Sequence, residues 1–247
     1  MEDTVSPDRP PVRIGLGDGL VLREGRRIAM PAREFQLCAT LALAGRPVAA
    51  ESLLELLWPD SDTSRARACL KVHVHRIRVR LGSRSALVSV SDRWALGTEI
   101  GTDLQHWRRL ANGRRPNLDS QRAALAHAFE EILAGPAPVL ARSFLGSRLD
   151  AEFADVFERI GGILIDDAFA CHDMARAAAL ARSAIAVDPY RDRWHEALIR
   201  AHVERGEYIA AHSILTSYAQ TLRSELGVSV PKGIEALVTR AAAANAR

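Results

Sequence analysis

The chain has 247 residues, a formal net charge of +3, 48% apolar residues and 26% charged residues. These values fit a soluble globular protein with one or two domains. A membrane-spanning protein is excluded, because no apolar stretch in the sequence approaches the roughly 20 residues that span a bilayer. A secretory signal is excluded as well, because the polar N-terminus lacks the apolar segment of such a signal. We expect a cytoplasmic protein with a disordered leader at residues 1–11.

Residues 12–100 mix short strand patterns with helical ones. A helical spacing of apolar residues follows Pro31 and stops at Gly45, and a second apolar stretch, Leu53–Trp58, stops at Pro59. Turn residues separate the strand candidates before these helices. The strand candidates are Val12–Leu16, Leu20–Arg23 and Ile28–Met30.

The segment from Thr63 to Ser91 is strongly basic and contains no Asp or Glu. Apolar residues recur in it at i, i+4, i+7 and i+11, which predicts a helix from about Ser64 to Leu81 that packs along one face and stays basic on the other. An ordinary amphipathic helix with a solvated face is the simpler interpretation, but such faces usually mix both signs of charge. An acid-free face favours binding to a phosphate backbone. The apolar residues are Leu70, Val74, Ile77 and Leu81, and the basic ones Arg65, Arg67, Lys71, Arg76, Arg78, Arg80 and Arg84.

A hairpin is predicted after the basic helix. Leu87–Val90 and Trp94–Leu96 have strand character and flank the polar turn that contains Arg93. Small strands, three helices and a terminal hairpin form a winged helix, in which the third helix fits the major groove of DNA. Arg93 is placed to reach an adjacent minor groove or a phosphate.

From Asp103 onward only helical patterns occur, and three further helices are expected after a long one over Asp150–Cys171. A series of residues follows the tetratricopeptide pattern of an aromatic residue, a leucine, a glycine turn and alternating small and large packing residues. Such helix pairs stack into a short solenoid that presents surfaces to partners. The residues of this series are Trp194, Leu198, Gly206, Tyr208, Ala211, Leu215 and Tyr218.

Other chemistries find little support in the sequence. His73 and His75 point about 200° apart on a helix, so they cannot share a metal ion. His195-Glu196 begins a metalloprotease-like pattern, but Ile199 stands where the second histidine belongs. We therefore expect no catalytic residue, no cofactor, no metal site and no enzymatic activity.

Both halves of the chain resemble one known family. The stretch from Ala66 to Gly82 resembles the recognition helix of response-regulator-type winged helices. Asp188–Asp192, Gly206-Glu207-Tyr208 and Leu222–Val228 resemble the bacterial transcriptional activation domain. The two modules in this order are typical of the Streptomyces antibiotic regulatory protein family of transcriptional activators.

The resemblance implies a fold class and domain limits. The fold class is mainly α, with an N-terminal winged helix-turn-helix (α+β) followed by an all-α, tetratricopeptide-like helical domain. The winged-helix DNA-binding domain is expected at residues 12–100, and the bacterial transcriptional activation domain at residues 101–247.

The resemblance also implies roles for single residues. Arg67, Lys71, His75 and Arg76 occupy positions that face the groove in similar helices, and Arg78 occupies a phosphate position. Trp58 closes the second helix, where packing is its first expected role and a contact between its indole N–H and phosphate its second.

The expected partners are double-stranded DNA upstream of promoters, RNA polymerase, and a second protomer on direct-repeat DNA. Two alternatives remain open. One is a protein-interaction scaffold or co-regulator with a degenerate winged helix, and the other is a repressor.

Overall fold

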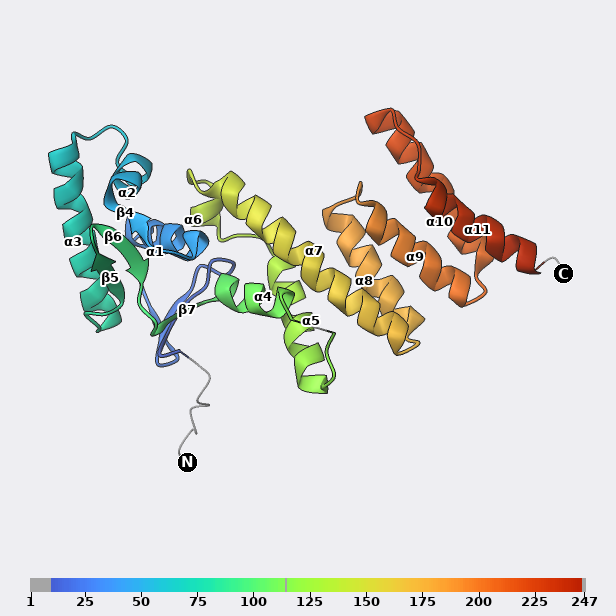
Figure 1. The fold of residues 1–247 in the computed structure, drawn as a ribbon, viewed down its shortest axis with the longest axis horizontal. Helices are drawn as coiled ribbons and strands as arrows, with labels where there is room; N and C mark the ends of the chain where they lie inside the picture. The colour runs from blue at the N-terminus through green and yellow to red at the C-terminus, as the bar shows by residue number, and fades with distance from the viewer. Residues whose placement is uncertain (1–9, 114, 246–247) are drawn as a thin grey trace. The chain divides into compact units, whose positions relative to one another are not determined.

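The computed structural model describes residues 10–113 and 115–245, so residues 1–9 of the predicted leader lie outside it. Figure 1 shows the fold, which is mainly helical with two small sheets near the N-terminus. The chain divides into two compact units. Unit 1 comprises Met1–Asn112 and Glu130–Phe157, and unit 2 comprises Gly113–Phe129 and Glu158–Arg247. None of the described helices has the length and apolar character needed to cross a membrane.

The N-terminal part of unit 1 is a winged helix. Its helices are α1 (Ala32–Ala44), α2 (Ala50–Leu57) and α3 (Thr63–Leu81). Its strands are β1 (Val12–Ile14), β2 (Val21–Arg23), β3 (Arg26–Ile28), β4 (Val48–Ala49), β5 (Leu87–Val90), β6 (Arg93–Leu96) and β7 (Ile100–Thr102). One sheet has the order β3-β2-β1-β7 and the other β4-β6-β5.

Some strands differ from their predicted positions. The third strand was expected at Ile28–Met30, but β3 covers Arg26–Ile28, because Glu24 and Gly25 both have positive φ and form the turn that pairs it with β2. Neither β4 nor β7 was predicted, since two or three residues are too few to show an alternating pattern. β7 pairs in parallel with β1, so this short strand belongs to the N-terminal sheet.

Helix α3 confirms its predicted pattern. Asp62 caps its first turn by accepting a hydrogen bond from the Arg65 amide at 2.9 Å, and Gly82 ends it with a left-handed φ of 68°. The four residues at i, i+4, i+7 and i+11 are all buried, as is Ala66. They pack with α1 and α2, whose buried residues include Phe35, Leu37, Leu53 and Leu57.

The rest of unit 1 consists of helical segments that follow β7. They are α4 (Asp103–Ala111), the end of α5 (Asp119–Leu133), α6 (Pro138–Ala141) and the start of α7 (Gly146–Ala170). Trp107 on α4 is fully buried, donates to the Glu131 carboxylate at 3.1 Å and meets the Phe153 ring edge to face. Arg108 donates to the carbonyl oxygens of Ala42 and Leu43, which satisfies acceptors at the C-terminal end of α1.

Unit 2 is a stack of helices. After α7 the sequence predicted three helices, whereas the described residues form four, because the segment after Gly227 is a separate helix. A π-helical turn, Leu222–Leu226, ends the one before it. Helix α6 also escaped prediction, since it has only four residues, and α7 begins at Gly146 instead of Asp150. The four helices are α8 (Met174–Val187), α9 (Asp192–Glu204), α10 (Tyr208–Thr221) and α11 (Lys232–Asn245).

Four of the seven tetratricopeptide residues, Trp194, Leu198, Ala211 and Tyr218, are buried in unit 2. Tyr208 and Leu215 are half-buried, and Gly206 makes the turn between α9 and α10 with a φ of 76°. The Tyr218 hydroxyl donates to the Asp192 carboxylate at 2.6 Å.

His195, the first residue of the metalloprotease-like dipeptide, also belongs to this core. Its ring stacks on Tyr218, and its Nε2 lies 2.9 Å from the Pro189 carbonyl oxygen. Burial lowers the pKa of this histidine. A packed, largely enclosed ring of this kind has a structural role.

Gly161 lies where α7 passes close to its neighbours in unit 2. A Cβ atom there would lie 2.9 Å from Phe129 and 3.2 Å from Trp194. We predict that Gly161→Ala lowers the free energy of unfolding by about 1–3 kcal/mol, because a packed core has no room for an added methyl group. Thermal unfolding of the variant measures this effect.

The control is Gly233→Ala in α11, where nothing lies within 4 Å of an added Cβ atom. Alanine is a better helix former than glycine, so the free energy of unfolding of this variant should rise by about 0.5–1 kcal/mol. Equal unfolding temperatures for both variants would contradict the close packing of α7.

Candidate nucleic-acid interface

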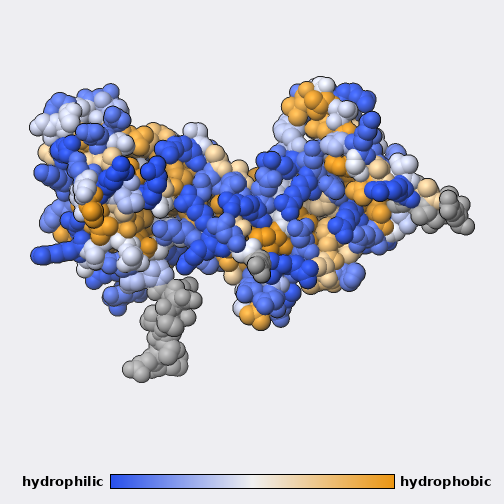
Figure 2. All heavy atoms as spheres, in the orientation of Figure 1, coloured by the Kyte–Doolittle hydropathy of each residue, from blue (hydrophilic) through white to orange (hydrophobic). Residues whose placement is uncertain are grey.

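The outward face of α3 carries the predicted base-reading residues. Lys71, His75 and Arg76 are exposed, whereas Arg67 is only partly exposed. Figure 2 shows the hydrophilic and apolar residues on one face of the molecule. Two apolar residues that sequence reasoning did not single out, Val72 (46% exposed) and Val79 (64% exposed), also lie on α3.

Helical spacing explains how these valines fit the face. At 100° per residue, Val72, His75 and Val79 lie opposite the buried row of α3. That same spacing could have identified them from the sequence. An exposed row that combines basic and small apolar side chains suits base edges, where cations meet guanine and methyl groups meet thymine.

Buried polar contacts fix α3 against α1. Glu34 on α1 is 1% exposed, and its carboxylate accepts a hydrogen bond from Arg80 Nε at 2.8 Å. The His73 ring lies 3.8 Å from the same carboxylate and stacks on Trp58 with 5.6 Å between ring centroids. His73 therefore packs against α1 and the end of α2. Burial lowers its pKa, against the opposing effect of Glu34.

The structure gives Trp58 a packing position. It follows the last residue of α2, its side chain is partly buried, and its indole ring covers His73. The predicted contact between its N–H and a phosphate stays a prediction.

The wing is the hairpin β5–β6, and its two-residue turn is Ser91-Asp92. Both turn residues have positive φ, 50° and 59°, as the tight hairpin turns that suit twisted strands require. Arg93 is exposed at the start of β6, where its side chain lies 3.4 Å from the Pro47 carbonyl oxygen. The hairpin thus holds Arg93 beside its tip.

Two arginines of α3 connect the helix to the wing. Arg67 pairs with the Asp92 carboxylate at 2.9 Å. Arg78 donates from Nε and a terminal nitrogen to the Leu87 carbonyl oxygen, at 3.1 and 2.5 Å, and its guanidinium lies 5.8 Å from the centre of the Trp94 ring. Arg78 therefore fixes β5 to α3, and its predicted contact with phosphate stays a prediction.

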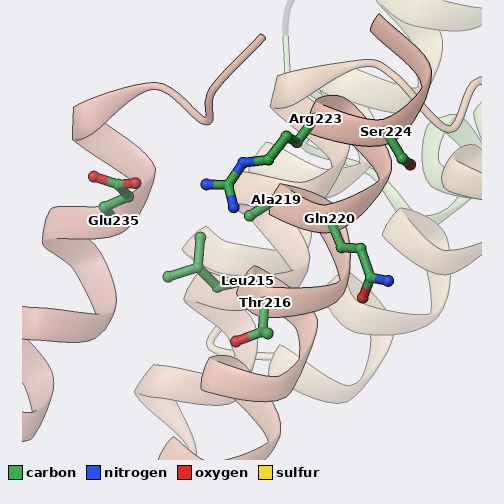
Figure 3. A pocket seen from close by; sticks show the side chains of 7 residues that line it. All are labelled: Leu215, Thr216, Ala219, Gln220, Arg223, Ser224 and Glu235. Carbon is green, nitrogen blue, oxygen red and sulfur yellow. The ribbon is translucent and has the colours of Figure 1, made fainter. Parts of the chain in front are cut away.

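The described residues contain no group of three or more His, Cys, Asp or Glu side chains that could hold a metal ion. In unit 2, a groove of about 650 Å³ lies beside α10 and α11 (Figure 3). Its lining includes one carboxylate, Glu235, and one guanidinium, Arg223, and it is largely apolar. Such a lining lacks the clustered acid and base groups of hydrolytic sites.

A winged helix with an acid-free third helix, joined to a stack of tetratricopeptide-like helices, defines a class of two-module regulators. Residues 102–240 match the model of the bacterial transcriptional activator domain, and residues 25–92 that of the C-terminal domain of transcriptional regulatory proteins. The chain belongs to the Streptomyces antibiotic regulatory protein family of transcriptional regulators.

One curated protein and one solved structure are similar to the chain. The chain is 28% identical to the regulatory protein AfsR of Streptomyces coelicolor, over 91% of the chain and 23% of that protein. Its fold is similar to that of Mycobacterium tuberculosis EmbR, solved in complex with a low-affinity phosphopeptide. The TM-score is 0.77 at 20% identity, covering 94% of this chain and 65% of EmbR. The chain thus spans less than two thirds of either relative.

The contact between Arg78 and the wing can be tested without DNA. We predict that Arg78→Met speeds amide hydrogen exchange in Leu87–Leu96 by an amount equivalent to about 1–2 kcal/mol, because Leu87 loses two charged donors. Arg76→Met is the matched control, since it removes the same charge from an exposed position two residues away. Exchange that is equally fast in both variants would show that Arg78 does not hold the wing.

Proposed function

We propose that this chain is a sequence-specific DNA-binding protein that activates transcription by contact with RNA polymerase. The observation that carries the proposal is the outward face of α3, which is exposed and free of acidic residues while the opposite face is locked into the core. Helix α3 is roughly 28 Å long at the usual helical rise, which suits a recognition helix in the major groove. The winged-helix domain is proposed at residues 12–100 and the activation domain at residues 101–247.

Contacts with DNA divide into two classes. Lys71, His75 and Arg76 are proposed to meet base edges, with Val72 in position for a thymine methyl group. Arg78, Arg93 and the Trp58 indole are proposed to position the protein on phosphates. Arg67 was expected to face the groove with the base-reading residues, but it is only partly exposed and pairs with Asp92 at the wing tip, so it too is proposed to contact phosphate. Arg67 would leave Asp92 to do so, and an exposed ion pair of this kind costs only about 0–1 kcal/mol to break.

The helical half is proposed to supply the contact with polymerase. Stacked helix pairs present extended surfaces to other proteins, and the family match covers this half of the chain. The proposal includes a cytoplasmic location, no enzymatic activity, and a second protomer on direct-repeat DNA.

The first test of specificity is a selection of bound fragments from genomic DNA of the source organism, at two salt concentrations. The proposal expects a shared motif upstream of genes. Binding without a motif that disappears at the higher salt concentration is non-specific phosphate binding. That result, or no binding, would favour the scaffold.

Arg76→Ala tests base reading on the selected site. We predict a loss of about 1–3 kcal/mol in specific binding and a broader sequence preference, because a bidentate contact to a base discriminates by that amount. Titrations on the selected site and on single-base variants measure both effects. Arg109→Ala, an exposed arginine on α4, is the control for charge and should bind like the unchanged chain.

Transcription in vitro tests the sign of regulation. With purified RNA polymerase and a supercoiled template that carries the selected site, the chain should raise transcript yield several-fold, and a scrambled site should abolish the increase. Arg76→Ala should require more protein for the same yield. A decrease in transcript would identify a repressor, and no change despite full occupancy would favour a co-regulator.

A further inference from the structure

The hairpin β2–β3 places two arginines directly opposite each other. Arg23 and Arg26 form a register pair, so their side chains share one face of the sheet. Both residues are exposed. Like charges directly opposite each other on neighbouring strands destabilise a sheet. Their pairing is therefore unfavourable unless an anion lies between or beside them.

Arg23 connects this pair to the C-terminal end of α3. The Arg23 guanidinium lies against Gly82, so closely that a side chain at this glycine would overlap it. Arg84 follows two residues later and is exposed. We call Arg23, Arg26 and Arg84 the hairpin cluster.

No ion pair among the described residues neutralises the hairpin cluster. None of the three guanidinium groups lies within 4 Å of a described carboxylate. Glu99 is the carboxylate beside Arg84 in space, and it accepts hydrogen bonds from the hydroxyls of Ser83 and Ser85, the two residues that flank Arg84. By contrast, Arg80, one turn earlier on α3, is bound to the buried Glu34.

The dipole of α3 can stabilise only one of the three positive charges of the hairpin cluster, that of Arg23. A cation at a helix C-terminus gains about 0.3–1 kcal/mol, and the effect ends within the last turn. Arg23 lies against that turn, but Arg26 and Arg84 lie beyond the helix, on the hairpin and in the following loop. A larger anionic surface on a partner could neutralise the positive charges of all three arginines.

From this geometry we infer that the hairpin cluster binds the phosphate backbone of DNA next to the bases that α3 reads. The inference rests on the proposed function. Helix α3 is roughly 28 Å long and the major groove is about 12 Å wide, so a helix that crosses the groove brings its ends to the flanking phosphates. In the hairpin cluster, Arg23 lies against the C-terminal end of α3, Arg26 is its partner across the hairpin, and Arg84 follows that end by two residues beyond Gly82. These contacts add affinity without adding sequence information.

The test uses the full chain and two duplexes that carry the selected site. One duplex ends at the edges of the site, and the other extends about one helical turn on each side. The dependence of the binding constant on salt is measured for both. The variant is Arg26→Gln/Arg84→Gln, which leaves the packed Arg23 in place.

The expected result is that the unchanged chain and the variant differ in the salt dependence of binding on the extended duplex. The unchanged chain should show a steeper salt dependence there than on the short duplex, and the variant should lose about two units of that slope, since each phosphate contact contributes about 0.9. On the short duplex, both proteins should behave alike. Arg26→Lys/Arg84→Lys keeps the charges and should restore the slope.

Arg109→Gln/Arg148→Gln is the control for net charge, because it removes two exposed arginines from helices outside the winged helix. It should behave like the unchanged chain. If Arg26→Gln/Arg84→Gln and the unchanged chain showed the same salt dependence on the extended duplex, the inference would be overturned, and an acidic protein would remain as the partner of the cluster. If the variant lost the same amount of salt dependence on both duplexes, the cluster would not contact phosphates that flank the site. If the unchanged chain bound neither duplex, the proposed function would fail, and this inference with it.

Discussion

Helix α3 has to serve as part of the core and as an exposed basic surface at once, and the winged helix is arranged around this constraint. Five buried residues, Ala66, Leu70, Val74, Ile77 and Leu81, secure one side of the helix. Burial of this row sets which side of the helix faces the core. Directional contacts hold that orientation on both flanks, from Arg80 to Glu34 on α1 and from Arg78 to Leu87 in the wing. The outward row is thereby held at a defined angle.

Much of this arrangement could be predicted from the sequence because it depends on local periodicity. The apolar spacing in residues 64–81 identified the buried side of α3, and glycines with positive φ ended α1 and α3 where expected. The aromatic, leucine and glycine residues of the tetratricopeptide series likewise predicted the core of unit 2. In each case, neighbours within a few residues determine the outcome, and the sequence displays that relationship directly.

Contacts between distant residues could not be predicted in the same way. β7 has three residues, and its strand character comes only from pairing with β1, almost ninety positions earlier. The sequence pattern predicted Arg78 as a basic residue near the end of α3. It could not predict that Arg78 donates to the Leu87 carbonyl oxygen, because the direction of a long side chain depends on what surrounds it. The exposed Val72 and Val79 differ from these cases, because the helical period alone is enough to place them on the outward face of α3.

The pair between Arg67 and Asp92 gives the wing tip a property that a purely basic surface would lack. A carboxylate here imitates a phosphate oxygen, because both offer the guanidinium a negatively charged acceptor in similar geometry. The protein thus carries an internal competitor for one of its own cations. On the proposed function, every stretch of DNA has to displace this competitor, and only a correct site adds base contacts to the phosphate contact that replaces it. The competitor thus weakens the hold on wrong sequences, which shortens the time that the protein spends there.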